Sequence, residues 1–95
     1  MKNKLLGKHK ETIKAIALRY GVRSIRVFGS FAKGEEDVNS DIDFLVELDP
    51  KRSLLDIISL KHEIEDVTGR KVTIVTKAAV SPYLIDQITK EAVRL

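Results

Sequence analysis

The sequence predicts one small domain in which helices pack against a β-sheet, and three observations support this prediction. Apolar residues recur alternately at helical and strand spacing, in the order helix, strand, short helix, strand, helix, strand, helix. The chain has 95 residues, enough for one hydrophobic core, so residues 1–95 are expected to form a single domain. Hydrophobic residues make up 43% and charged residues 33% of the chain, which is the ordinary composition of a globular protein.

The first part of the chain is expected to form a helix, a strand and a short helix. Apolar residues recur at three- and four-residue steps over about residues 3–20, and Gly21 follows at a position where helices commonly end. Residues 24–28 then alternate between the two faces of a strand that would end at Gly29. A short helix over residues 30–35 would come next.

The second strand is expected over residues 41–48, after a polar loop at residues 34–40. Alternate residues of a strand point to opposite faces. One face of this strand is apolar and the other is mostly charged: Ile42, Phe44 and Val46 on the first, and Asp41, Asp43, Leu45 and Glu47 on the second. One face of the strand therefore suits the hydrophobic core, and the charged residues of the other face need another explanation.

The last part of the chain is expected to form a helix, a third strand and a final helix. Ser53 can cap the first of these helices, and Gly69 would end it. Residues 71–76 indicate the strand, and Ser81-Pro82 is a typical helix start. The expected inner faces are Leu54, Ile57, Leu60, Ile64 and Val67 for the earlier helix and Leu84, Ile85, Ile88 and Ala92 for the final one.

Composition excludes several classes of protein. No apolar run approaches the roughly 18–20 residues of a membrane span, and the charged N-terminus lacks the apolar stretch of a signal peptide. There are no cysteines, which excludes disulfides and thiolate metal sites. We therefore expect a cytoplasmic protein with no membrane partner.

The charge is unevenly distributed. Residues 1–30 carry eight Lys or Arg and one acid, whereas residues 35–49 carry seven acids and no base. A solvated helix face explains the basic part most simply, and a surface for nucleic acid or an acidic partner is the alternative. With two tyrosines, three phenylalanines and no tryptophan, a base-stacking platform has little support.

Asp41 and Asp43 are candidates for metal binding. Residues i and i+2 of a strand lie about 6.5–7 Å apart on one face, so the two carboxylates repel each other and raise at least one pKa. A divalent cation removes that cost, and Mg²⁺ prefers a few carboxylate oxygens together with substrate phosphates. A pair of metals shared by such carboxylates can hold both oxygens of a phosphoryl-type displacement. The alternative is a pair of aspartates on the solvent side of a half-exposed strand.

Gly29 and Ser30 are candidates for phosphate binding. Glycine allows a phosphate to approach the backbone, and a helix start offers unpaired N–H groups. Ser30 adds a hydroxyl donor, and Lys33 could reach the same phosphates one turn later. A plain helix cap is the alternative role for Ser30. Together with the aspartate pair, this turn would complete a site for a nucleoside triphosphate and its metal.

The stretch from Val27 to Val46 resembles the polymerase-β-like nucleotidyltransferases, and most closely their minimal nucleotidyltransferase domains. The family signature is Gly-Ser, ten residues, then Asp-x-Asp, which here is Gly29-Ser30 followed by Asp41-Ile42-Asp43. The resemblance extends over about residues 20–93. It implies an α+β fold with a small mixed sheet of about three to four strands flanked by helices.

The resemblance also implies an activity. Family members transfer a nucleoside monophosphate, usually AMP, from ATP or another NTP to a hydroxyl, with Mg²⁺, and release pyrophosphate. Gly29 and Ser30 would bind the phosphates, and Asp41 and Asp43 would hold the metals and be catalytic. Many minimal domains are similar to antitoxins of toxin–antitoxin pairs, in which the domain binds a helical HEPN-type toxin and adenylylates it.

The chain departs from the family pattern at Thr73. The third strand of the family usually carries a third carboxylate there, which helps to bind the catalytic metal and activate the attacking hydroxyl. Threonine is a weak Mg²⁺ ligand and no base at pH 7. Glu47 lies on the same strand face as Asp43, but about 13 Å further along the strand, which is too far to replace the missing group.

Three functional hypotheses follow. The first is an active nucleotidyltransferase, and the second is a degenerate domain that binds and neutralises its partner without transfer. The third, a basic nucleic-acid binder, rests on the N-terminal charge alone. The chain has no separate acceptor-recognition domain, so we expect acceptor specificity to come from a partner or from a homo-oligomer.

Overall fold

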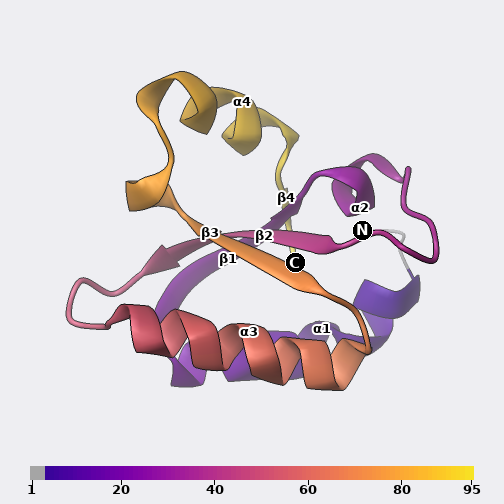
Figure 1. Cartoon of the computed structure of the whole chain (residues 1–95), viewed down its shortest axis with the longest axis horizontal. Coiled ribbons are helices and arrows are strands. Elements are labelled where there is room, and N and C mark those ends of the chain that lie inside the picture. Colours follow the sequence, from indigo (N-terminus) through magenta and orange to yellow (C-terminus); the bar gives the residue numbers. More distant parts are fainter. Residues whose placement is uncertain (1–3) are drawn as a thin grey trace.

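The computed structural model describes residues 4–95, as four α-helices and one four-stranded sheet (Figure 1). None of these helices is both long enough and apolar enough to cross a membrane. In chain order the elements are α1 (Lys4–Arg19), β1 (Val22–Phe28), α2 (Ser30–Lys33), β2 (Ile42–Leu48), α3 (Leu54–Thr68), β3 (Val72–Thr76), the 3-10 helix η1 (Lys77–Ala79), α4 (Pro82–Glu91) and β4 (Val93–Arg94).

The sheet is mixed, with the strand order β3-β2-β1-β4. β1 pairs antiparallel with β2 and with β4, whereas β2 and β3 are parallel. Parallel neighbours need a crossover connection, and α3 provides it between β2 and β3. The α+β class and the small mixed sheet flanked by helices are thus confirmed.

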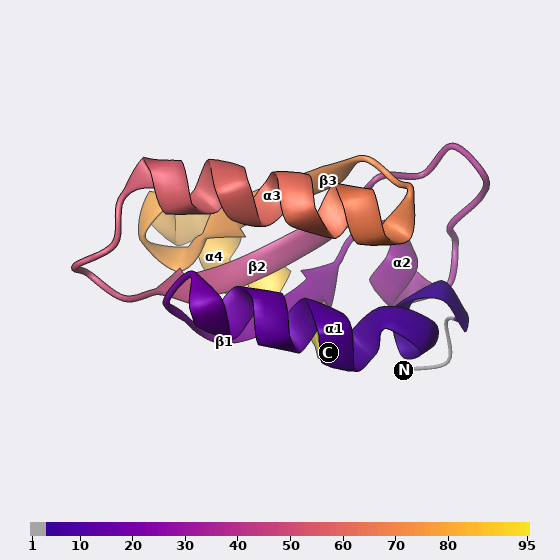
Figure 2. The ribbon, with the colours of Figure 1, turned by 90° about the horizontal axis from the view of Figure 1, so that it is seen from below.

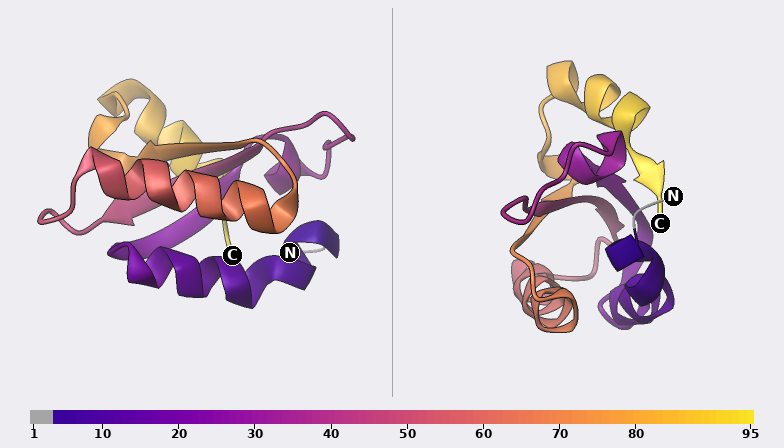
Figure 3. Two further views of the ribbon diagram at one scale, coloured as in Figure 1. Left: turned by 60° about the horizontal axis from the view of Figure 1, so that its bottom comes forward. Right: turned by 90° about the vertical axis from the view of Figure 1, so that its right-hand side faces the viewer.

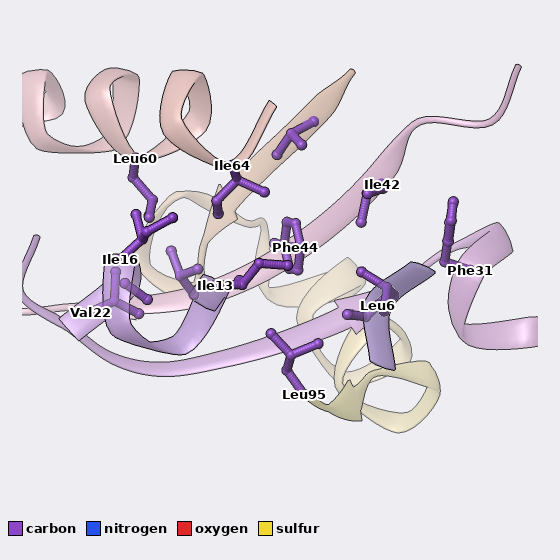
Figure 4. Close-up of a cluster of buried hydrophobic side chains, with 14 of the residues drawn as sticks. Leu6, Ile13, Ile16, Val22, Phe31, Ile42, Phe44, Leu60, Ile64 and Leu95 are labelled. Carbon is purple, nitrogen blue, oxygen red and sulfur yellow. The ribbon is translucent and has the colours of Figure 1, made fainter. Parts of the chain in front are cut away.

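The two faces of the sheet are covered differently. α1 and α3 lie side by side across one face (Figure 2), while α4 stands on the opposite side and α2 lies at the end of β1 (Figure 3). The hydrophobic core fills the space between the sheet and the α1–α3 layer (Figure 4). It includes Leu6, Ile13, Ile16, Ile42, Phe44, Val46, Leu60 and Ile64. The alternate residues of β2, with both aspartates, therefore belong to the α4 side.

Element boundaries differ from expectation by one or two residues. β1 starts at Val22 and β2 at Ile42, and α2 already ends at Lys33. The expected helix start at residue 3 lies outside the described residues. The structure also adds β4, which the sequence did not predict, because two residues are too few to show an alternating pattern.

Two predicted inner faces are partly wrong. Leu54 is 73% exposed at the first turn of α3, and Leu84 is 52% exposed on α4. No residue of α4 is buried. The reason is that α4 stands over the sheet face with the polar residues Arg26, Asp43 and Thr73, which offers little apolar surface to pack against.

A polar contact joins the two helices of the core layer. Arg19 Nη2 of α1 donates a hydrogen bond of 2.8 Å to Glu63 Oε1 of α3. The pKa of Glu63 is lowered, chiefly because the Tyr20 hydroxyl stabilises its ionised form. Desolvation opposes this effect, and the Arg19 guanidinium adds a smaller stabilisation of the charge. The ionised carboxylate therefore favours the folded state.

Replacing Glu63 with glutamine is expected to lower the melting temperature near neutral pH and to matter progressively less in acid. Because its pKa is lowered on folding, the carboxylate stabilises the protein above its ordinary pKa of 4.5 and loses this effect as the pH falls through the folded value. Melting curves between about pH 3 and pH 7 measure the difference. Glu11→Gln, an exposed change on α1, is the control, and a difference that stays constant with pH would contradict the prediction.

Candidate active site

The Gly-Ser turn and the aspartate pair meet because β1 and β2 are neighbours. Phe28 pairs with Asp43 in the antiparallel ladder, so the next residue, Gly29, lies against the Asp43 side chain. A Cβ atom on Gly29 would lie only 2.3 Å from Asp43 Oδ2. Gly29 also has φ 71° and ψ −149°, a conformation that is essentially restricted to glycine. Both the backbone and the contact therefore require glycine here.

Ser30 is the first residue of α2, and Gly29 occupies the N-cap position before it. The Gly29 carbonyl accepts hydrogen bonds from the amides of Ala32 and Lys33, at 3.1 and 3.2 Å. Ser30 is therefore not the capping residue, which removes the alternative role considered for it. Its side chain is half-buried at the point where the turn meets β2.

The two aspartates differ in their surroundings. Asp41 is exposed and directly precedes β2, whereas Asp43 is half-buried within the strand. The pKa of Asp43 is raised, first by burial and then by the negative charge of Asp41. This carboxylate pair lacks a compensating positive charge, which a bound cation would supply.

Thr73 lies beside Asp43 on β3, the neighbour of β2 on the side away from β1. The two residues are Cα partners in the parallel β2–β3 ladder, so their side chains leave the sheet on the same face. Thr73 is exposed there. The structure thus brings Gly29, Asp43 and Thr73 into one row across three elements, with the threonine hydroxyl at the place where the family resemblance predicts a carboxylate.

Lys33 and Glu47 each form an ion pair away from the Asp43 carboxylate. Lys33 Nζ lies 3.7 Å from Glu91 Oε2 at the end of α4, so it bridges α2 and α4. Glu47 Oε2 lies 3.9 Å from Lys77 Nζ, toward the other end of β2. The described residues contain no group of three or more His, Cys, Asp or Glu side chains placed to hold a metal.

Sequence reasoning missed Arg70, which holds the loop before Asp41. Its Nη1 donates to the carbonyl oxygens of Asp37, at 2.8 Å, and Ser40, at 3.2 Å. The loop is also closed internally, since the Asp37 amide donates to Ser40 Oγ at 2.9 Å. Arg70 follows α3 and is far from Asp41 in sequence, so only the fold could show that it positions the residue before the aspartate pair.

Gly29→Ala is expected to destabilise the protein more than Gly34→Ala. The two glycines have nearly the same positive φ, 71° and 72°, but a Cβ on Gly34 would meet nothing within 4 Å. The Gly34 change should therefore cost about 1–2 kcal/mol for backbone strain alone. Denaturant unfolding of both variants measures the difference.

A double-mutant cycle isolates the contact with Asp43. In an Asp43→Ala background the carboxylate that a new Cβ would strike is gone, so Gly29→Ala should cost less than it does in the native chain. Equal costs in both backgrounds would show that the Asp43 side chain does not constrain Gly29.

Comparison with known proteins shows the family of the chain. The family model described as a nucleotidyltransferase domain matches residues 8–95. A Methanocaldococcus jannaschii protein, provisionally named a protein adenylyltransferase, is 44% identical over 84 residues, which cover 88% of this chain and 90% of that protein.

Solved structures share the fold. One, provisionally described as a minimal nucleotidyltransferase, is 36% identical and superposes with a TM-score of 0.90 over 99% of this chain and 98% of its own. A crystal structure described as a toxin–antitoxin with AMP-PNP is 21% identical, with a TM-score of 0.78 over 90% of this chain and 70% of its own, which is a likeness of fold. The chain thus belongs to the nucleotidyltransferase domain family and has the fold of a minimal nucleotidyltransferase.

Proposed function

We propose that this protein binds ATP or another NTP with Mg²⁺ and transfers a nucleoside monophosphate, AMP in the simplest case, to a hydroxyl group of a protein partner. The observation that carries the proposal is the contact between the Gly29 backbone and the Asp43 carboxylate. It sets the Gly29-Ser30 turn, which would bind the phosphates, directly beside Asp43. The protein adenylyltransferase name of the M. jannaschii relative supports a protein as the acceptor.

The residues at this site fit Mg²⁺. Asp41 and Asp43 offer only oxygen ligands, and neither carboxylate takes part in an ion pair within residues 4–95. When bound between these carboxylates, the ion would neutralise their repulsion and stabilise negative charge on the substrate phosphates. Two carboxylates leave several ligand positions for phosphate oxygens and water.

The chain's own groups then have separate roles. Gly29 lets the phosphates approach the backbone, Ser30 donates its hydroxyl to them, and Lys33 contributes a positive charge once it leaves Glu91. In the transfer step the acceptor oxygen bonds to the α-phosphorus, the bond from phosphorus to the bridging oxygen breaks, and pyrophosphate leaves. The hydroxyl proton is released to water, because Thr73 is no base near neutral pH.

A second candidate function rests on Thr73. Its position opposite Asp43 is where a third carboxylate would act, and its side chain cannot replace that group. A domain with this substitution can still bind nucleotide and partner through the other residues. Loss of one well-placed catalytic group typically lowers the rate about 10²–10⁴-fold, so binding without transfer is the alternative function.

We also propose that the partner is a HEPN-type toxin and that the protein acts as its antitoxin in the cytoplasm. The fold shared with the toxin–antitoxin structure supports this pairing. Co-expression with the neighbouring gene product followed by gel filtration is expected to give one complex. Separate elution of the two proteins would contradict the pairing.

Mg-ATP is expected to stabilise the native protein against heat. At a ligand concentration about 100 times the dissociation constant, the stabilisation should be about 2.7 kcal/mol. The double variant Asp41→Asn, Asp43→Asn should lose the magnesium-dependent part. Asp66→Asn, an exposed change on α3, is the matched control and should respond as the native chain does. If millimolar Mg-ATP does not change the melting temperature of the native protein, the proposed nucleotide site is wrong.

Thr73→Asp is expected to raise the rate of AMP transfer, because the new carboxylate would lie opposite Asp43 in the correct register. The added charge should also destabilise the metal-free protein and increase the gain from Mg²⁺. Transfer of labelled AMP to the purified partner measures the rate, with Thr73→Asn as the uncharged control. A native chain whose full activity is unaffected by Thr73→Asp would show that another group does this work.

A further inference from the structure

Arg26 is a charged residue on the α4 side of the sheet to which the proposed reaction gives no role. It lies on β1, two residues before Phe28, and its Cα partner on β2 is Leu45. Leu45 and Asp43 are alternate residues of β2, so Arg26 and Asp43 leave the sheet on the same face. Two residues of a strand span about 6.5–7 Å, which places Arg26 one step along the sheet from the candidate active site.

The acids nearest to Arg26 on this face do not pair with it. Asp43 and Glu47 are its diagonal neighbours on β2, but in the described part of the chain neither forms an ion pair with its guanidinium. Its lateral neighbours are the buried, apolar Leu45 on β2 and another cation, Arg94, on β4. Along β1, the residues that share its face are Ser24 and Phe28. A guanidinium here has a like charge beside it, which is an unfavourable cross-strand pair.

The acids of α4, which stands over this face, do not compensate for it. Glu91 is paired with Lys33, and Asp86 is exposed. Within residues 4–95, the Arg26 guanidinium takes part in no ion pair, and its Nε is buried without a hydrogen-bond partner. A buried donor on a charged group that stays unpaired is costly, so this arginine weakens the free fold.

We propose that Arg26 is an oxyanion-binding residue at the edge of the active site and that a phosphate or carboxylate of a substrate pairs with its guanidinium. The inference rests on the proposed function, which brings two oxyanion sources to this face. One is the triphosphate of the NTP, and the other is an acidic side chain next to the acceptor hydroxyl. A planar guanidinium binds either group through two parallel hydrogen bonds.

The position of Arg26 allows the two sources to be distinguished. Arg26 and Ser30 lie on opposite sides of Asp43 along the chain direction of β1. Arg26 precedes Phe28, the partner of Asp43, and Ser30 follows it. Phosphates held by Gly29 and Ser30 reach Arg26 only if the nucleotide runs past Asp43 along β1. A carboxylate on the acceptor reaches it if the acceptor hydroxyl lies at Asp43 and the neighbouring acidic side chain points along β1 toward Arg26. Each source therefore predicts a different ligand whose affinity depends on Arg26.

The test compares native protein with Arg26→Met, which removes the charge, and Arg26→Lys, which keeps the charge but not the planar fork. Arg23→Met is the control, because it removes the same charge from β1 at a residue that pairs with Asp49. One arm measures the affinity for Mg-ATP by calorimetry. The other arm measures, with Mg-AMP-PNP present, the affinity for a labelled peptide in which glutamates flank a tyrosine, against the same peptide with glutamines.

We expect Arg26→Met to raise the melting temperature of the free protein. It should also lower the affinity for one of the two ligands by about tenfold or more, the typical effect of losing a charged hydrogen bond. Loss of Mg-ATP affinity identifies the triphosphate as the ligand. Loss of the preference for the glutamate peptide identifies the acceptor carboxylate. Arg26→Lys should retain part of the affinity, and Arg23→Met should retain all of it.

If Arg26→Met changes neither affinity, the proposal is overturned, whatever its effect on melting. This outcome is distinct from failure of the proposed function, in which the native protein itself does not bind Mg-ATP. In that case the peptide arm still tests Arg26, since a native preference for the glutamate peptide that Arg26→Met abolishes would support the oxyanion role. Absence of any such preference would then overturn it.

Discussion

The packing of Gly29 against the Asp43 carboxylate is the constraint on which the candidate site depends. It follows from the β1–β2 register, which sets Phe28 opposite Asp43 and so turns the chain at the carboxylate. A shift of one residue would send Asp43 into the core and one of its apolar neighbours to the α4 side, so the hydrophobic pattern of β2 and the site geometry fix the same register. The ten residues between Ser30 and Asp41 span a loop that α2 begins and Arg70 holds at its end.

The sheet divides its two faces between stability and chemistry. The α1–α3 face receives almost all the fully buried side chains, including Phe44 of β2. The other face carries Arg26, Asp43 and Thr73 in adjacent register positions, and the helix above it buries no residue. A chain of this length builds one core. The other face is covered only in part, since Leu45 on it is buried while Thr73 is exposed.

Much of this arrangement could be predicted from the sequence, and the parts that could not have identifiable causes. The spacing of Gly29-Ser30 and Asp41-x-Asp43 indicated the site, because the resemblance depends on local motifs. Strand order, the fourth strand and the register of Thr73 against Asp43 depend on pairing between distant segments, which periodicity does not encode. The same holds for Arg26, whose side chain is unusual only once Leu45 and Arg94 are known to be its neighbours.

Under the proposed function, Thr73 and Arg26 would both leave work to the acceptor. Within the described residues, the aspartate pair and the Arg26 guanidinium lie one step apart on the same face, and neither takes part in an ion pair. Because the two groups do not pair with each other in the described fold, each charge could bind a ligand group of opposite sign. The first turn of α4 exposes Tyr83 by 93% and Leu84 by 52%, which is apolar surface on the helix that stands over this face. A protein acceptor that contacts α4 while presenting a hydroxyl to Asp43 would use both kinds of surface, and under the proposed function its binding energy would position that hydroxyl without help from a base at Thr73.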